Sequence, residues 1–360
     1  MRASQLRLKN FRNYQDYSFD LSEGLTILVG PNAVGKTNCI EALQLLSAGY
    51  SFKHPLLSEL ILDGQEKAHI SYNLEGEGRK HKLALEISLK KKSYLLNSKT
   101  CSFSQVRGLL PSVLFNPDDL RLVKDAPQYR RDALDQLGIQ LNEKYGDIKL
   151  NYEKSLQQRN KLLREERVDE NMLAAWTESL CSYGLLYYRY RRSLFERLKP
   201  WFIRHYSKIA PHENIDIHYI PSFTSSSTMD SNVLRETLLQ KMKELELEER
   251  IRKRSLVGPH RDDFIVEING RSARSYASQG QQRSIVLALK QAELSLIYEL
   301  IGYYPLLLLD DVMSELDEQR RSSLLSLLNL GIQTVVSTTH LSYFSQDIIS
   351  SANLVELNYA

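Results

Sequence analysis

Apolar and polar positions follow two different periods in the first fifty residues. Leu6 and Leu8 alternate with polar neighbours, and the apolar run 25–29 ends at Gly30, so both segments are predicted to be strands. From residue 38 the apolar positions 40, 43 and 46 recur at helical spacing. The chain therefore opens with strands, a glycine-bounded turn and a helix.

The middle of the chain carries a longer helical pattern. No proline interrupts the sequence between Pro127 and Pro200, and this favours long helices. Two stripes step by three and four residues, which is the spacing of a heptad seam. They are Leu141, Tyr145, Ile148, Tyr152 and Leu156, and then Leu173, Trp176, Leu180, Tyr183, Tyr187, Tyr190 and Leu194. We expect two antiparallel helices joined by a turn near 168–170, which together form an arm.

The pattern beyond this arm returns to alternating strands and helices. A Ser/Thr-rich segment, 222–231, is predicted to be a linker before a third helix at 234–245. Further strands are predicted at 83–89, 113–115, 264–268, 306–309 and 334–337, and helices at 281–300 and 324–330. The sequence thus predicts an α/β head, formed by residues 1–125 and 254–360, with a helical arm inserted at 126–253.

The turn after the strand 25–29 fits the phosphate-loop pattern GxxxxGK[ST]. Its residues are Gly30, Pro31, Asn32, Ala33, Val34, Gly35, Lys36 and Thr37. In such a loop the backbone N–H groups and the helix start face phosphate oxygens, the lysine adds a point charge, and the Thr hydroxyl reaches Mg²⁺. Because a predicted strand precedes it and a predicted helix follows, a chance match in an ordinary turn is the weaker interpretation.

Two acidic residues follow the apolar run 306–309. Strand ends of open α/β sheets carry ligands, so Asp310 is expected to hold Mg²⁺ and Asp311 to orient or deprotonate the attacking water. The alternative is an aspartate pair that caps the next helix or turn. The phosphate loop favours the first interpretation.

A third motif precedes the predicted helix 281–300. Ser278 is a good N-cap residue, and that structural role alone explains it. The helix start also offers N–H groups without an anion of their own in this stretch. Taken with the other two motifs, Ser278, Gly280 and Gln281 become candidates for contact with a nucleotide.

Composition limits the possible classes of protein. The chain has 360 residues, 25% of them charged, and a net charge of +3. Its three cysteines form no CxxC pair, which argues against a disulfide framework or a zinc site, and no run approaches the length of a membrane span. We expect a cytoplasmic protein without a membrane partner.

One short stretch of the arm is much more basic than the chain as a whole. It holds seven basic residues against the single acid Glu196, namely Arg189, Arg191, Arg192, Arg197, Lys199, Arg204 and Lys208. Such a stripe favours binding to a phosphate backbone. The alternative is that the bases only solvate the arm while the interleaved tyrosines form its core. Lys90, Lys91 and Lys92 are a second patch or a solvated strand end.

These motifs, in this order, resemble the ABC-type ATPase head, and more narrowly the RecF family, a bacterial relative of the SMC and Rad50 heads. The narrower resemblance rests on the segments 8–14, 115–120, 130–132, 258–263 and 309–312, and it covers nearly the whole chain. It implies a Rad50/SMC-like P-loop ATPase head with ATP and Mg²⁺ as cofactors. It also implies site roles for Arg12, Asn38, Asp317 of a D-loop and His340 as a switch residue. Asn116 is expected where related ATPases have the Q-loop glutamine, as a further Mg²⁺ ligand.

The same resemblance implies a function. ATP is expected to join two copies of the chain, with Lys36 and Thr37 of one copy and Ser278 of the other on opposite sides of it. The homodimer would bind double-stranded DNA near gaps and act with RecR and RecO to load RecA. Hydrolysis is expected to be slow, because Asp311 stands where transporters have the longer glutamate. The alternatives are a transport ATPase subunit and a nucleotide-gated structural adaptor without functional turnover.

Overall fold

The computed structural model describes residues 1–76, 78–224 and 230–358, and its contacts divide the chain into two units. Unit 1 is Met1–Asp119 with Val286–Ala360, and unit 2 is Leu120–Ile285. The helical unit therefore includes residues 254–285, which the sequence pattern assigns to the head. Residues 225–229 of the predicted linker lie outside the described part of the chain.

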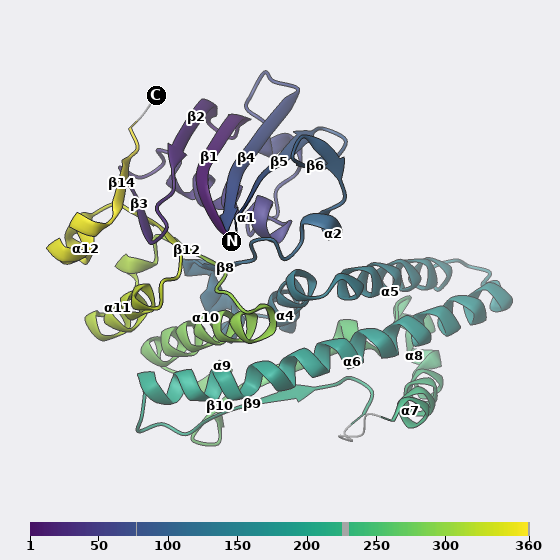
Figure 1. Ribbon diagram of the computed structural model, residues 1–360. Coiled ribbons are helices and arrows are strands. Elements are labelled where there is room, and N and C mark those ends of the chain that lie inside the picture. Colours follow the sequence, from purple (N-terminus) through teal and green to yellow (C-terminus); the bar gives the residue numbers. More distant parts are fainter. Residues whose placement is uncertain (77, 225–229, 359–360) are drawn as a thin grey trace. The chain divides into compact units, whose positions relative to one another are not determined.

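Unit 1 contains two sheets, labelled in Figure 1. The antiparallel sheet has the order β2-β1-β4-β5-β6-β7, and the parallel sheet has the order β14-β3-β13-β12-β8. The first contains β1 (Arg2–Phe11), β2 (Tyr14–Asp20), β4 (Lys67–Gly76), β5 (Arg79–Ser88), β6 (Lys92–Leu96) and β7 (Lys99–Cys101). The second contains β3 (Leu25–Val29), β8 (Ser112–Phe115), β12 (Leu306–Asp310), β13 (Thr334–Thr338) and β14 (Asn353–Glu356).

Helix α1 (Lys36–Ala48) packs against strands of both sheets of unit 1. The other helical segments of this unit are η1 (Ser58–Leu60), α2 (Phe103–Val106), η4 (Val312–Ser314), α11 (Glu318–Leu325), η5 (Ser326–Leu330), η6 (Leu341–Tyr343) and α12 (Gln346–Ser351). The division between the units falls within η2 (Pro117–Leu120) and α10 (Gln279–Ile301). One apolar cluster joins α1 to both sheets, so the helix that follows the phosphate loop rests on a rigid support.

Unit 2 consists mainly of helices with a small sheet of order β11-β10-β9. Its helices are α3 (Arg121–Lys124), α4 (Pro127–Leu141), α5 (Glu143–Leu162), α6 (Glu170–Ile209), α7 (Ser231–Glu244), α8 (Glu246–Arg252), η3 (Pro259–Arg261) and α9 (Ala273–Tyr276). Its strands are β9 (Ile215–Ile220), β10 (Asp263–Ile268) and β11 (Arg271–Ser272). The pair α5 and α6 is the predicted antiparallel arm, and most residues of the two predicted stripes pack in one apolar cluster. Leu141, however, ends α4, and Leu173 and Trp176 lie in a separate cluster.

Two predicted helices differ from the structure. Helix α6 continues through Pro200 to Ile209, because Phe202 and Tyr206 beyond the proline are fully buried and this packing outweighs the missing backbone hydrogen bond. The segment 324–330 is not one helix. Helix α11 begins at Glu318, where the Asp317 carboxylate caps it, and η5 ends at Gly331 in the left-handed conformation.

A buried ionic network connects α4, α5 and α6. Asp135 accepts both guanidinium N–H groups of Arg191 at 2.9 Å, and Tyr145 donates to the same carboxylate at 2.6 Å. The Lys149 ammonium lies 3.1 Å from it. Arg191 also donates to the carbonyl of Pro259 at 2.6 Å, so this network ties three helices to the segment before β10.

His260 makes the stability of unit 2 dependent on pH. Its Nδ1 lies 2.6 Å from the Tyr152 hydroxyl and its Nε2 3.2 Å from the Ser255 carbonyl. Burial, with the charges of Arg261 and Arg131, lowers the pKa of His260 from 6.5 to about 4. Below pH 6.5 the unfolded chain therefore binds a proton that the folded chain does not.

This linkage predicts that acid destabilises unit 2 through His260. Between pH 7 and pH 5 the imidazole should remove about 2 kcal/mol of folding free energy, and His260→Gln should lose correspondingly less over the same interval. Urea unfolding of both proteins at the two pH values, followed by hydrogen exchange in α5, measures this. Equal acid sensitivity in the two proteins would contradict the assignment to His260.

Candidate phosphate-binding site

The predicted phosphate loop lies at the carboxyl edge of the parallel sheet, between β3 and α1. In the register of this sheet Leu309 is opposite Phe115 on one side and Val336 on the other. The next residues are Asp310, Asn116 and Ser337, so three polar side chains follow neighbouring strand ends. The fold brings them to the edge where ligands bind in open α/β sheets.

Two glycines of the loop are required by its geometry. Gly35 has φ 112°, and a Cβ there would lie 2.6 Å from the Tyr14 hydroxyl oxygen and 2.8 Å from the Asn13 amide nitrogen. A Cβ on Gly30 would overlap the carbonyl oxygen of Leu357, which is backbone and cannot move aside cheaply. Both positions therefore exclude side chains, because the chain's own residues pack directly against the loop.

Lys36 points back over the loop. Its buried ammonium donates to the carbonyl oxygens of Gly30 and Pro31, both at 2.7 Å. Burial lowers the pKa of Lys36, while the nearby charges of Asp311 and Asp310 act to raise it. The cation and both predicted acids therefore converge on one place.

Thr37 and Asp310 meet across the site although 273 positions separate them. The Thr37 hydroxyl donates to Asp310 Oδ1 at 3.0 Å, and the Ser337 hydroxyl donates to the same oxygen at 2.7 Å. Burial raises the pKa of Asp310, and these two hydrogen bonds oppose that rise. Ser337 was not predicted as a site residue; its position at the end of β13 is the signal that could have identified it.

The other two side chains at this edge are Asp311 and Asn116. Asp311 is half-buried with φ 54°, a left-handed conformation, and its N–H donates to the Ser337 hydroxyl at 3.0 Å. Strained residues of this kind concentrate at functional sites. The Asn116 amide oxygen is buried and, among the described residues, has no hydrogen-bond partner. An unsatisfied buried oxygen fits the predicted role of Asn116 as a ligand.

A second group of residues supports the loop from the side of α1. The Asn13 amide donates to the Val34 carbonyl at 3.1 Å and accepts from Asn38 at 2.8 Å. The predicted nucleotide contact Arg12 forms a bidentate pair with the fully buried Glu41, at 2.8 and 2.9 Å. Asn13 and Glu41 were not predicted. An acidic residue inside the apolar stripe of the helix that starts at Lys36 was a signal for Glu41.

Lys53 lies next to this group. Its ammonium donates to the Asn38 amide oxygen at 3.0 Å and lies 3.7 Å from Glu41. Burial lowers the pKa of Lys53, and the charge of Glu41 opposes that shift. The segment after α1 therefore adds a further cation beside the phosphate loop, and sequence reasoning gave no reason to expect it.

The remaining predicted nucleotide residues lie in both units. In unit 1, His340 is exposed with its ring 6.4 Å from that of Tyr343, and Asp317 caps α11. In unit 2, the exposed Ser278 and the half-buried Gln281 form a capping box at the start of α10: Gln281 N–H donates to the Ser278 hydroxyl at 3.2 Å, and Ser278 N–H to the Gln281 side chain at 2.8 Å. Gly280 lies in this first turn. The N-cap role is confirmed, and their contact with a nucleotide stays a prediction.

The structure corrects one predicted DNA contact. Arg191 is fully buried in the network around Asp135, so its guanidinium cannot reach a phosphate backbone. Tyr187 and Tyr188 are buried core residues, as the alternative interpretation of this stripe states.

The other basic residues of the stripe lie closer to solvent. Arg192 pairs with Glu196 at 3.1 Å, and Lys199 pairs with Asp216 at 2.7 Å. Arg189, Arg197 and Arg204 are exposed. Arg189 donates to the Ser231 hydroxyl, and Arg204 stacks over Trp201. Their contact with DNA stays a prediction.

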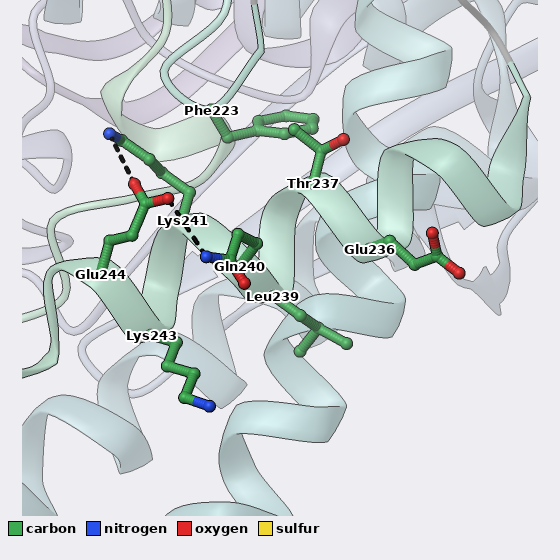
Figure 2. A pocket seen from close by; sticks show the side chains of 8 residues that line it. All are labelled: Phe223, Glu236, Thr237, Leu239, Gln240, Lys241, Lys243 and Glu244. Atoms are coloured by element: carbon green, nitrogen blue, oxygen red, sulfur yellow. Dashed lines mark hydrogen bonds and ion pairs between the residues drawn. The ribbon is translucent and has the colours of Figure 1, made fainter.

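A hollow of about 650 Å³ on α7, shown in Figure 2, holds none of the predicted site residues. Within it Lys241 and Gln240 both bind the Glu244 carboxylate, so much of the charge of Glu244 is neutralised inside the hollow.

In residues 1–76, 78–224 and 230–358 we find no group of three His, Cys, Asp or Glu side chains arranged to hold a metal. No helix in those ranges has the length and apolarity to span a bilayer.

Comparisons with known proteins cover nearly the whole chain. Residues 3–353 match the family model of the RecF/RecN/SMC N terminal domain. The DNA replication and repair protein RecF of Cyanothece sp. is 38% identical over an aligned length of 364 residues, gaps included, and the alignment covers 99% of this chain and 96% of that protein. The protein of the same name from Bacillus cytotoxicus is 35% identical over 361 residues, covering 99% of this chain and 97% of its own length.

Solved structures agree with this result. The recombination mediator protein RecF of the RecFOR pathway, solved as RecF-ATPrS, superposes with a TM-score of 0.90 at 32% identity and covers 96% of this chain and 94% of its own. The Smc head domain of Pyrococcus furiosus, bound to the C-terminal domain of ScpA, has a TM-score of 0.55 at 15% identity and covers 99% and 94%. The second likeness shows the fold alone, and that fold is the predicted ABC-type ATPase head.

Proposed function

The chain belongs to the RecF family of DNA replication and repair proteins, and from that premise we propose that it is an ATP-dependent DNA-binding protein. A relative at 32% identity has been solved as RecF-ATP. The observation that carries the proposal for this chain is the bond between Thr37 and Asp310, which joins the phosphate loop to the strand-end acid. We also propose a cytoplasmic location.

The residues of the loop would bind a triphosphate through their backbone. The N–H groups of residues 33–37 and the start of α1 supply donors, and Lys36 supplies the cation. The Lys36 ammonium already bonds to two loop carbonyls, so it is held in place before a phosphate arrives.

The oxygen atoms at the strand ends fit Mg²⁺. The ion prefers hard oxygen ligands and is usually held by one or two carboxylates together with substrate phosphates, so a carboxylate beside a hydroxyl and an amide oxygen is a suitable set of ligands. Thr37, Asp310 and Asn116 would hold it. When bound, it neutralises charge on the phosphates. Asp311, half-buried and beside this set, would orient or deprotonate water.

Membership of this family also suggests how the chain acts on DNA. We infer an ATP-dependent homodimer that binds double-stranded DNA near gaps and helps RecR and RecO load RecA, with slow DNA-stimulated hydrolysis. The matching relatives are DNA replication and repair proteins. This likeness favours a role in DNA repair over the alternative of a transport ATPase subunit. An adaptor without turnover makes a different prediction for Asp311, argued in the Discussion.

Dimerisation can be tested at Ser278. The exposed start of α10 would face the triphosphate of a second copy, and an arginine there would block its approach. Size-exclusion chromatography with light scattering should show a dimer for the natural chain in Mg-ATP and a monomer in ADP. Ser278→Arg should stay monomeric in both while its affinity for ATP changes less than about threefold. A variant that dimerises like the natural chain would contradict the proposal.

A further inference from the structure

Three arginines from separate segments of unit 2 come together after α8. The Arg261 guanidinium donates to the carbonyl of Ser255 at 3.2 Å, and Ser255 directly follows Arg254. The Arg131 guanidinium, from α4, donates to the carbonyl of Asp262 at 2.8 Å, and Asp262 directly follows Arg261. These backbone contacts hold Arg131, Arg254 and Arg261, the arginine cluster, beside one another. Lys253, exposed at the end of α8, adjoins it.

Within unit 2 the nearby carboxylates of Asp132, Asp263 and Asp262 offset part of the charge of Arg131 alone. Arg254, Arg261 and Lys253 are exposed, and within the described part of the chain none of the three forms an ion pair. Burial and the positive charges of Arg254 and Arg131 lower the pKa of Arg261. The charges of the cluster therefore repel one another, and this repulsion destabilises the folded chain until an anion binds there.

Acidic side chains close to the cluster already have other partners. Glu249 binds Arg159 at 2.6 Å, and Asp263 binds Arg130 at 2.7 Å. Asp262 is buried and accepts from the Tyr219 hydroxyl at 2.6 Å. Glu248 pairs with Arg252, the neighbouring base on α8. These carboxylates already bind other side chains, so Arg254, Arg261 and Lys253 present their charge to solvent.

We propose that the arginine cluster, with Lys253, binds the phosphate backbone of double-stranded DNA. This inference rests on the proposed DNA-binding function, and it assigns the surface that contacts DNA to the arginine cluster instead of the basic stripe of α6. Guanidinium groups suit phosphate because they offer several N–H donors in a fixed fork. Such contacts position a duplex without reading its sequence.

The stripe on α6 is the less favourable surface. One of its guanidinium groups, that of Arg191, is buried, and Arg192 and Lys199 are neutralised by Glu196 and Asp216. A base that must leave an internal carboxylate to reach a phosphate gains less than an unpaired one. Arg254, Arg261 and Lys253 carry no such cost. On α6, Arg189 and Arg204 are also exposed, but Arg189 binds the Ser231 hydroxyl and Arg204 lies over the Trp201 ring.

The test compares matched variants of the full-length chain in Mg-ATP by fluorescence anisotropy with a labelled duplex. Arg254→Gln/Arg261→Gln should weaken binding by at least about tenfold and reduce the dependence of log K on log salt by about 1.8. Lys253→Asn/Arg254→Gln breaks no internal side-chain bond of the described chain and should act in the same direction. The matched control Arg189→Ala/Arg204→Ala should change affinity less than about threefold.

The outcomes separate the two proposals. If the natural chain does not bind the duplex, both the proposed DNA-binding function and the proposed role of the arginine cluster are wrong. If the natural chain binds and the two cluster variants bind equally well, only the inference fails. A loss confined to the α6 pair would return the contact surface to the predicted stripe. Nucleotide titration and thermal melting of each variant confirm that folding is intact.

Discussion

Arg191→Met is expected to lower the free energy of unfolding of unit 2 by about 3–5 kcal/mol. The guanidinium is fully buried and forms two bonds to Asp135, one to the hydroxyl of Tyr187 and one to the Pro259 carbonyl. Methionine fills much of the volume but leaves the buried carboxylate without its main counter-charge. The effect should be near the lower limit, because Lys149 still lies 3.1 Å from that carboxylate. Urea unfolding with hydrogen exchange in α4–α6 measures it.

Two further variants make this prediction specific to charge. Arg189→Met removes an exposed guanidinium two positions away and should cost less than about 1 kcal/mol. Asp135→Asn combined with Arg191→Met removes both charges and should recover part of the loss, because no unpaired ion remains buried. If Arg191→Met were no more destabilising than Arg189→Met, the network would not hold the helices together.

The helices could be predicted from the sequence where one regular spacing of apolar residues runs along the whole segment. The stripes in α5 and α6 give the antiparallel pair directly, because a heptad seam has only one face to bury. The prediction that Arg191 contacts DNA was wrong because periodicity identifies buried positions only by their apolar residues. An arginine on the buried face of a helix therefore cannot be distinguished from a solvated one by sequence pattern. Its partner Asp135 lies 56 positions away, a separation that no local pattern contains.

The residues of the candidate site that belong to sequence motifs could be predicted, whereas the residues that pack around the phosphate loop could not. The phosphate loop and Asp310 each follow a strand, so local sequence places them at one edge of the sheet. Asn13 and Lys53 reach the same place through tertiary packing of the turn between β1 and β2 and of the segment after α1. The antiparallel sheet also joins strands that are distant in sequence, such as β1 and β4, and their pairing depends on a register that alternation alone does not fix.

Asp311 is the residue at which hydrolysis and mere nucleotide binding can be separated. It has a left-handed backbone at the end of β12, and its N–H is fixed by Ser337. Asparagine tolerates the same conformation and keeps the size of the side chain, so Asp311→Asn should fold like the natural chain. It removes only the negative charge that could orient or accept a proton from water. The expected defect is therefore chemical.

Asp311→Asn is expected to slow ATP hydrolysis by about 100- to 10,000-fold, the usual contribution of a general base, while ATP affinity changes less than about threefold. Single-turnover hydrolysis and equilibrium titration with a fluorescent nucleotide give the two numbers. Asp63→Asn, the same substitution at an exposed position of unit 1, is the control and should change neither. Equal hydrolysis by Asp311→Asn and the natural chain would place the base elsewhere. Full repair activity by the hydrolysis-deficient variant would favour the adaptor, because gating by nucleotide would then suffice without turnover.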